Sequence, residues 1–87
     1  VSLCPQVAYV HYNLGAVQME LGEVELAVAS YTKAIECDPH FPDAYYNRGV
    51  ANLKLGRKEQ GLSDLSQAGE YGLYHAYSLI KQYSANK

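Results

Sequence analysis

The side chains in this sequence that could carry out chemistry are three histidines and two cysteines. His11, His40 and His75 lie in three separate segments, whereas Cys4 and Cys37 stand near the ends of predicted helices. A nucleophilic cysteine needs a histidine close enough to accept its proton, and neither cysteine has a histidine at a recognisable spacing. The sequence therefore predicts no catalytic residue, and we expect that the chain is not an enzyme.

One short turn, Cys37-Asp38-Pro39-His40, places potential metal ligands close together. A metal site needs several such side chains to converge, and the rest of the sequence suggests no second group. The glycines are spaced for helix ends and helix packing, and they do not form a loop that would surround a phosphate. We therefore expect no metal site and no cofactor, and the histidines are interpreted as packing or solvated residues.

The composition indicates one small globular domain. The chain has 87 residues, of which 48% are hydrophobic and 18% are charged, so it has enough apolar side chains to fold. Its net charge of −2 argues against a broad nucleic-acid-binding surface. No apolar run approaches the length that spans a membrane, so membrane insertion is not expected. The two cysteines are interpreted as thiols of a reducing compartment, which predicts a cytoplasmic location.

Apolar residues recur at helical spacing in five stretches, and no stretch alternates as a strand would. The five stretches cover about residues 6–21, 24–37, 41–55, 62–72 and 73–83. Gly22 and Gly56 are predicted to close the first and third helices, because glycine readily adopts the positive φ of a helix C-terminus. Pro39 cannot continue a helix and ends the second one. The chain is therefore predicted to be all-α.

A shift of 34 residues superimposes one half of the sequence on the other. It pairs Pro5 with Pro39, Tyr12 with Tyr46, Asn13 with Asn47, Gly15 with Gly49, Leu21 with Leu55, Gly22 with Gly56 and Ala34 with Ala68. A helix–turn–helix unit of this period is typical of helical solenoids, in which neighbouring units stack to bury their apolar faces. The predicted fold is a right-handed helical solenoid of antiparallel helix pairs.

The pattern resembles the tetratricopeptide repeat, in which aromatic, leucine, small and proline residues recur at fixed offsets. The matching residues of the first repeat are His11, Leu14, Gly15, Gln18, Ala27, Tyr31, Ala34 and Pro39. Those of the second repeat are Tyr45, Arg48, Gly49, Asn52, Gly61, Leu65 and Ala68. The small residues stand where helices must approach closely, and Tyr31 and Leu65 are expected to fill the space between helices. His11, Gln18 and Arg48 depart from the family pattern.

The repeat register divides the chain into four segments. Residues 1–5 align with the end of a repeat and are interpreted as the last part of a truncated upstream repeat. Residues 6–39 and 40–72 are the first and second repeats, and residues 73–87 are a C-terminal capping helix and tail. The outer face of the first helix pair would then be uncovered. Self-association through this exposed N-terminal face is therefore a further expectation.

The resemblance implies a protein–protein interaction module that binds a partner peptide or segment in a concave groove. The groove-facing offsets fall on the first helix of each pair, and they select Tyr9, Tyr12, Asn13, Ala16, Met19, Glu20, Asp43, Tyr46, Asn47, Val50, Leu53 and Lys54. The amides of Asn13 and Asn47 could bond the backbone of a bound peptide, or they could bond a neighbouring helix. An alternative function is a purely structural cap, or a self-association segment, of a longer repeat array.

Overall fold

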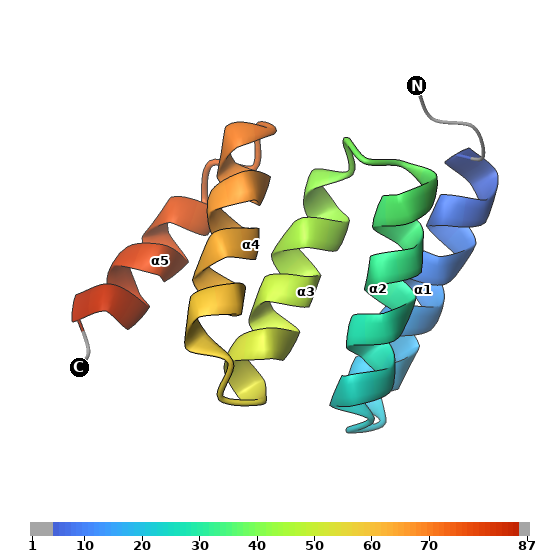
Figure 1. Cartoon of the computed structure of the whole chain (residues 1–87), viewed down its shortest axis with the longest axis horizontal. Helices are drawn as coiled ribbons and strands as arrows, with labels where there is room; N and C mark the ends of the chain where they lie inside the picture. The colour runs from blue at the N-terminus through green and yellow to red at the C-terminus, as the bar shows by residue number, and fades with distance from the viewer. Residues whose placement is uncertain (1–4, 86–87) are drawn as a thin grey trace.

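The computed structural model describes residues 5–85, which fold into five α-helices without a strand in that range. The helices are α1 (Pro5–Glu20), α2 (Val24–Cys37), α3 (Pro42–Lys54), α4 (Lys58–Glu70) and α5 (Ala76–Ala85). Consecutive helices run antiparallel and pack side by side in chain order, so α1 and α5 lie at opposite ends of the molecule (Figure 1). The predicted all-α helical solenoid is confirmed.

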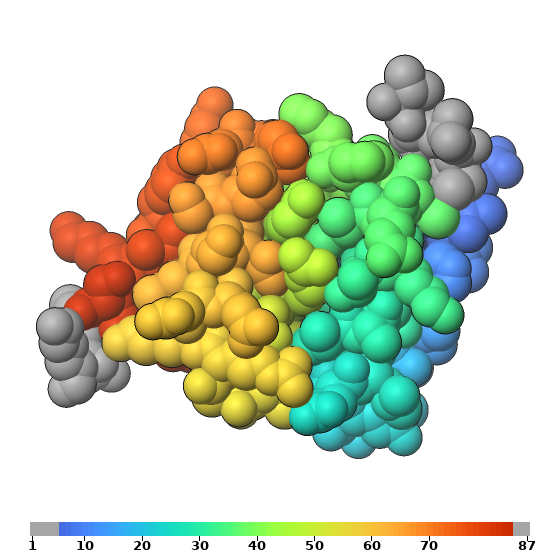
Figure 2. Space-filling view, in the orientation of Figure 1, coloured from blue at the N-terminus to red at the C-terminus, as the bar shows by residue number. Residues whose placement is uncertain are grey.

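The molecule is a slab of 39 × 28 × 16 Å. In the space-filling view, α2, α3 and α4 form most of the visible face, while α1 shows only at one edge (Figure 2). The strongest packing is within the pairs α1–α2 and α3–α4, and α2 also packs on α3. This arrangement sets α1 and α3, the first helices of the two pairs, next to each other.

The helix ends follow the predicted glycines. Gly22 has φ +82°, and its N–H donates to the carbonyl of Met19 at 3.1 Å. The next N–H, of Glu23, donates to the carbonyl of Gln18 at 2.8 Å, which completes a Schellman motif. Gly56, with φ +81°, closes α3 with the equivalent pair of bonds one repeat later. Both glycines therefore close helices as predicted.

The core lies between the helices of each pair and depends on close backbone approach. Tyr31 and Leu65, 1% and 0% exposed, are the largest fully buried side chains of the described residues, as the register predicts. A Cβ atom on Gly15 would lie 2.7 Å from the Tyr31 ring, and one on Gly49 would lie 2.9 Å from the carbonyl oxygen of Gly61. Glycine is therefore required at both predicted contact points.

Several predicted boundaries differ from the structure. The fourth helix already begins at Lys58, before the apolar stretch at 62–72, and ends at Glu70. The helix expected from residue 73 begins at Ala76, because the N–H of Leu73 donates to the carbonyl of Ala68 and belongs to the C-terminal turn of α4. The helix expected from residue 6 already begins at Pro5, since proline is well tolerated in a first helical turn. The rest of the segment interpreted as an upstream repeat, residues 1–4, and the tail residues 86–87 lie outside the described residues.

Candidate functional site

A hollow of about 200 Å³ lies between the first helices of the two pairs. Its lining residues are Ala16 and Met19 of α1, Asn47 and Val50 of α3, and Tyr31 of α2. Four of these five residues are ones that the sequence places in a groove. Tyr31 was predicted only as a packing residue, but the structure brings it to the same hollow. The site thus combines apolar walls with one amide and one buried phenol.

The amide of Asn47 connects α3 to α1. Its Nδ2 atom donates a hydrogen bond of 3.1 Å to the hydroxyl oxygen of Tyr12. Of the two roles considered for this asparagine, contact with a neighbouring helix is therefore realised, although the residue also lines the hollow. Asn13, one repeat earlier, is exposed.

Burial raises the pKa of the two phenols around the hollow. It raises the pKa of Tyr31 to about 12, and the nearby Tyr12 adds to this effect. The pKa of Tyr12 is raised chiefly by burial and further by the negative charge of Asp43, while the bond from Asn47 opposes the shift. Both hydroxyl groups therefore remain protonated near neutral pH and can act as donors or acceptors.

An aromatic cluster extends from the hollow to the surface at one end of α1. Tyr12 lies 5.8 Å from Tyr31 and 5.1 Å from Phe41, measured between ring centroids. Tyr9 stacks on Tyr12 at 5.9 Å and on Phe41 at 6.4 Å, and it is 58% exposed. The predicted groove residues Tyr9 and Tyr12 therefore belong to one continuous aromatic surface, which Phe41 completes.

The same contact recurs one repeat later with a different partner. Tyr46 packs edge-on against His75, with ring centroids 4.9 Å apart. The 34-residue shift relates this pair to Tyr12 and Phe41, so His75 occupies the position of a phenylalanine. Neither Phe41 nor His75 was assigned to the groove from the sequence. Their equivalence under the repeat shift is the signal that could have identified them.

The remaining predicted residues of α3 do not line the hollow. Leu53 packs against the cluster around Leu65 and lies next to Gly61, where it fills space between α3 and α4. Tyr46 contacts the same cluster, and so does Val50, which also lines the hollow. The predicted groove residues therefore divide into a group at the hollow and a group that mainly packs.

Exposed residues at the helix ends form the last predicted group. Lys54 and Glu20 are exposed at the C-terminal ends of α3 and α1, and Asp43 is exposed in the first turn of α3. None of the three lines the hollow. Their assignment to the groove stays a prediction.

Comparison with known proteins assigns the family. The family model described as TPR repeat matches residues 18–56, which run from the last turn of α1 to just beyond the end of α3. The chain belongs to the tetratricopeptide repeat family. Repeats of this family act as protein–protein interaction modules and as a rule are not catalytic. None of the helices described for this tetratricopeptide repeat chain is long and apolar enough to cross a membrane.

Three of the relatives are much longer than this chain. It is 38% identical over 63 residues to the FK506-binding protein-like of Homo sapiens, and the match covers 72% of the chain and 18% of the relative. It is 31% identical over 62 residues to NADPH oxidase activator 1 of Rattus norvegicus, which covers 71% of the chain and 14% of the relative. It is 37% identical over 68 residues to the UDP-N-acetylglucosamine–peptide N-acetylglucosaminyltransferase of Giardia intestinalis, and this match covers 78% of the chain and 5% of the relative. The chain thus spans less than a fifth of each of these relatives.

Two departures from the tetratricopeptide pattern form a polar network. Arg48, at a leucine position, pairs with Asp64 through Nε at 2.9 Å and Nη2 at 2.8 Å, and Nη1 donates to Thr32 at 3.2 Å. Asn52, at an aromatic position, donates to the same carboxylate at 3.1 Å. The hydrogen bonds of Asp64 raise the pKa of Arg48, and burial opposes the shift. The network therefore links α3 to α4 through one buried carboxylate, and Arg48 extends it to α2 through Thr32.

The first repeat contains a neutral version of this contact. Ser30 donates to the side-chain oxygen of Gln18 at 2.7 Å, and the 34-residue shift relates this pair to Asp64 and Asn52. A hydrogen bond between the two helices of a pair is therefore repeated where the family pattern has an aromatic residue. A second hollow, of about 450 Å³, opens beside Arg48, but the charge of this arginine is already compensated by Asp64.

The histidines take part in ring packing or lie at the surface. His40 stacks on Tyr71 at 4.0 Å between centroids, which joins the α2–α3 loop to the end of α4. His75 contacts Tyr46, as described above, and His11 is half-buried in α1. Within residues 5–85, no three His, Cys, Asp or Glu side chains gather as metal ligands would. Cys4 lies outside the described residues.

Proposed function

We propose that the chain binds an extended segment of a partner protein in the groove between α1 and α3. The observation that carries this proposal is the hollow formed by Ala16, Met19, Tyr31, Asn47 and Val50. Clefts with apolar walls and a few placed polar groups are the usual form of binding sites. The aromatic surface of Tyr9, Tyr12 and Phe41 continues the hollow toward solvent and offers contact area that is already ordered.

The groove suits one apolar side chain of the partner with the adjoining backbone. The side chain would enter between Ala16 and Val50, and the backbone would bond the amide of Asn47. Rings such as Tyr9 lose little rotamer freedom on binding, because they have only two side-chain torsions and are already stacked. A preformed groove lowers the entropic cost of association, so most of that cost falls on the partner segment.

A peptide library displayed on phage and selected on the immobilised 87-residue chain would supply ligands for calorimetric titration. Ala16→Leu fills the hollow and should weaken the selected peptides at least about tenfold, which corresponds to about 1.4 kcal/mol. Ala29→Leu is the matched control, because Ala29 is exposed on α2 and should leave the affinity unchanged. Equal affinities for both variants would place the peptide outside the groove.

The two asparagines provide a second comparison. Asn47→Ala removes the amide at the hollow and should weaken binding, whereas Asn13→Ala changes an exposed residue that does not line it. Unchanged affinity in both variants would remove the asparagines from the binding proposal. A larger effect of Asn13→Ala would indicate that the peptide binds nearer to the exposed side of α1.

A structural cap is the second candidate function. The favouring observation is the cluster of Leu65, Ala68 and Ala76, all 0% exposed, which forms where α5 covers α4. On this proposal residues 6–39 and 40–72 are the repeats and residues 73–87 close the array. If a longer protein containing this segment kept its partner after substitution of Tyr46 and Asn47, the cap would be the better description.

The cellular location and the absence of nucleic-acid partners stay predictions from composition. The net charge of −2 supports the second of them. Microscopy of the tagged parent protein would test a cytoplasmic location, and a gel-shift assay with duplex DNA and RNA would test the expected lack of binding. A shift that weakens with salt would contradict the expectation.

A further inference from the structure

The exposed end of the aromatic surface is a stack of rings. The plane of the Tyr9 ring lies at 26° to that of Tyr12 and at 14° to that of Phe41, with centroid distances of 5.9 and 6.4 Å. Tyr9 is 58% exposed, whereas Tyr12 and Phe41 are half-buried. The outermost ring of the stack is therefore accessible, and a further planar group can lie against it.

The position of Tyr9 in the repeat stays accessible when another helix pair precedes it. The 34-residue shift relates Tyr9 to Asp43. The pair α1–α2 precedes Asp43 and packs on its repeat, yet Asp43 is exposed. The exposure of Tyr9 is therefore a property of its place in the repeat, on the side of the groove.

Asp43 supplies a negative charge beside the stack. It lies in the first turn of α3, two residues after Phe41. Burial, and after it the charge of Asp43, raises the pKa of the Tyr12 hydroxyl, so the field of this carboxylate reaches the stack. Neither ion pair formed within residues 5–85 includes Asp43. Its carboxylate is therefore available to a cation of a partner.

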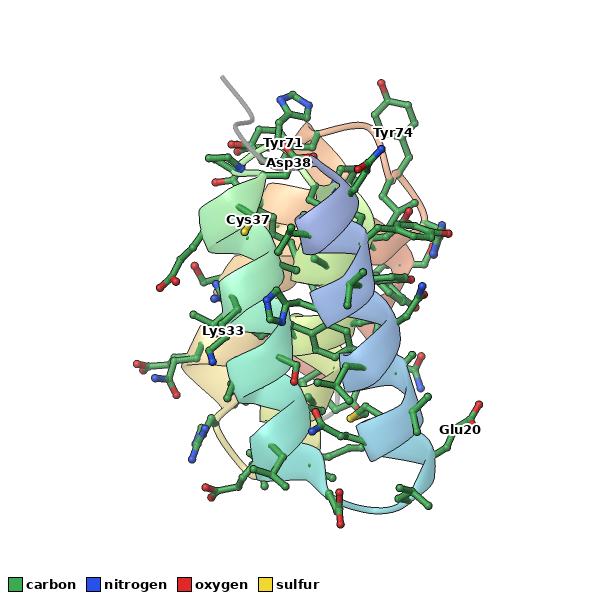
Figure 3. All side chains as sticks on the ribbon, turned by 90° about the vertical axis from the view of Figure 1, so that its right-hand side faces the viewer. Glu20, Lys33, Cys37, Asp38, Tyr71 and Tyr74 are labelled. Carbon is green, nitrogen blue, oxygen red and sulfur yellow. The ribbon has the colours of Figure 1, made fainter. Side chains whose placement is uncertain are left out.

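The other charges among the predicted groove residues lie away from the stack. Glu20 is the only charged residue of α1, and Figure 3 shows it at the end of that helix opposite the chain's N-terminus. Lys54 is the last residue of α3, about 16 Å along the helix from Asp43. The end of the groove at Tyr9 is therefore acidic, and the cation of Lys54 is too distant to pair with Asp43.

The second repeat already holds an arginine between a tyrosine ring and a carboxylate. The Cζ atom of Arg48 lies 5.5 Å from the centroid of the Tyr45 ring, and its guanidinium donates two hydrogen bonds to Asp64. A guanidinium group suits this arrangement, because it is planar, stays charged and is more weakly hydrated than an ammonium group. Tyr9 and Asp43 offer the same two chemical groups at the surface.

We propose that the partner segment carries an arginine, whose guanidinium stacks on Tyr9 and pairs with Asp43. This inference rests on the proposed function, since the same segment places an apolar side chain in the hollow. Ala16 follows Tyr9 by seven residues, about 10 Å along α1, which an extended segment spans in about three residues. The arginine therefore lies about three residues from the apolar side chain. The nearly parallel rings suit a planar guanidinium better than a methylated ammonium, which aromatic cages enclose.

The phage-selected peptides described above provide the first test. Arginine should be enriched at about three residues from the apolar residue, and calorimetric titration compares each synthetic peptide with a copy in which citrulline replaces that arginine. Citrulline keeps the shape of the side chain and removes its charge. The citrulline peptide should bind about tenfold more weakly, because both the ring contact and the ion pair need the charge. Equal affinities of the two peptides overturn the proposal.

Variants of the chain test the two contacts separately. Asp43→Asn should weaken the arginine peptide about threefold and leave the citrulline peptide unchanged, so the two substitutions are coupled. Glu59→Gln is the matched control, because Glu59 is exposed in the first turn of α4 and loses the same charge. Tyr9→Phe should keep the preference for arginine, and Tyr9→Ala should reduce it, since the ring makes the contact. An effect of Asp43→Asn that Glu59→Gln shares, or that both peptides show, overturns the pairing with Asp43.

A probe without an apolar residue separates this inference from the groove proposal. N-acetyl-arginine methylamide should shift the nuclear magnetic resonance signals of the Tyr9 ring, N-acetyl-citrulline methylamide should not, and Ala16→Leu should leave this difference unchanged. Peptides that Ala16→Leu weakens but citrulline does not would retain the groove and overturn the arginine site. If the library yields no peptide, the groove proposal fails and this probe alone decides: equal shifts from both compounds overturn the arginine site, and a selective shift retains it.

Discussion

The buried pair of Arg48 and Asp64 can be exchanged for residues that the chain already uses one repeat earlier. Leu14 and Ser30 occupy the equivalent positions of the first repeat. Arg48→Leu and Asp64→Ser together therefore convert the second repeat to the pattern of the first. We predict that Arg48→Leu alone is strongly destabilising and that adding Asp64→Ser restores most of the loss.

The magnitude follows from the contacts. Arg48→Leu removes three hydrogen bonds and leaves the carboxylate of Asp64, which is 8% exposed, with Asn52 as its remaining donor. Removal of one partner from a buried ion pair costs about 3–5 kcal/mol. The two side chains are 21% and 10% exposed, so water offsets part of this cost, and we expect about 2–3 kcal/mol. The double variant should lie within about 1 kcal/mol of the parent, because apolar or neutral replacements of such pairs are often tolerated.

The assay is urea unfolding followed by far-ultraviolet circular dichroism, with the free energy extrapolated to water. The parent, the two single variants and the double variant form a double-mutant cycle, and the coupling energy should be about 2 kcal/mol. Failure of Arg48→Leu to fold, together with a folded double variant, would support the same conclusion. A double variant that is no more stable than Arg48→Leu would refute the reasoning.

Four further predictions concern the core. Tyr31→Ala should lower the free energy of unfolding by about 3–5 kcal/mol, because the ring is 1% exposed, and an unchanged thermal melt would contradict this. Burial raises the pKa of Tyr31 to about 12, so the neutral phenol stabilises the fold fully below pH 10, and this contribution is lost as the pH rises through about 12. In Tyr31→Phe, the free energy of unfolding should therefore depend less on pH between about 10 and 12. Ala27→Leu should cost about 1–3 kcal/mol through overpacking, since Ala27 is 0% exposed, whereas Ala29→Leu at an exposed position should change the melt little. Gly49→Ala should also cost about 1–3 kcal/mol, because its Cβ would lie 2.9 Å from a backbone oxygen, and a wild-type urea midpoint would show that the two helices can separate freely.

The sequence predicted the parts of the fold that depend on spacing. The 34-residue repeat gave the helix pairs, and it distinguished Gly22 and Gly56, which close helices, from Gly15 and Gly49, where helices touch. These predictions succeeded because a positive φ or a short contact leaves few residue types possible. The start of α5 was missed because the turn after Gly72 continues through hydrogen bonds that composition does not reveal.

The candidate site was predicted only in part. The groove offsets identified Ala16, Met19, Asn47 and Val50, because the helical period determines which residues lie on the same face of a helix. The roles of Arg48 and Asp64 could not be predicted, because their partnership joins two helices across 16 residues and departs from the family pattern. Long-range pairs of this kind become visible only when the helices are placed.

Tyr31 forms the floor of the hollow and is also one of the two largest buried side chains of the core. The same ring lies against Gly15 and, in the proposed binding mode, lies beneath a partner side chain that enters the hollow. A change of specificity at this floor is therefore also a change of fold stability. Over evolutionary time, we expect new partners to be acquired through the exposed rim at Tyr9, while the floor varies only together with its packing neighbours.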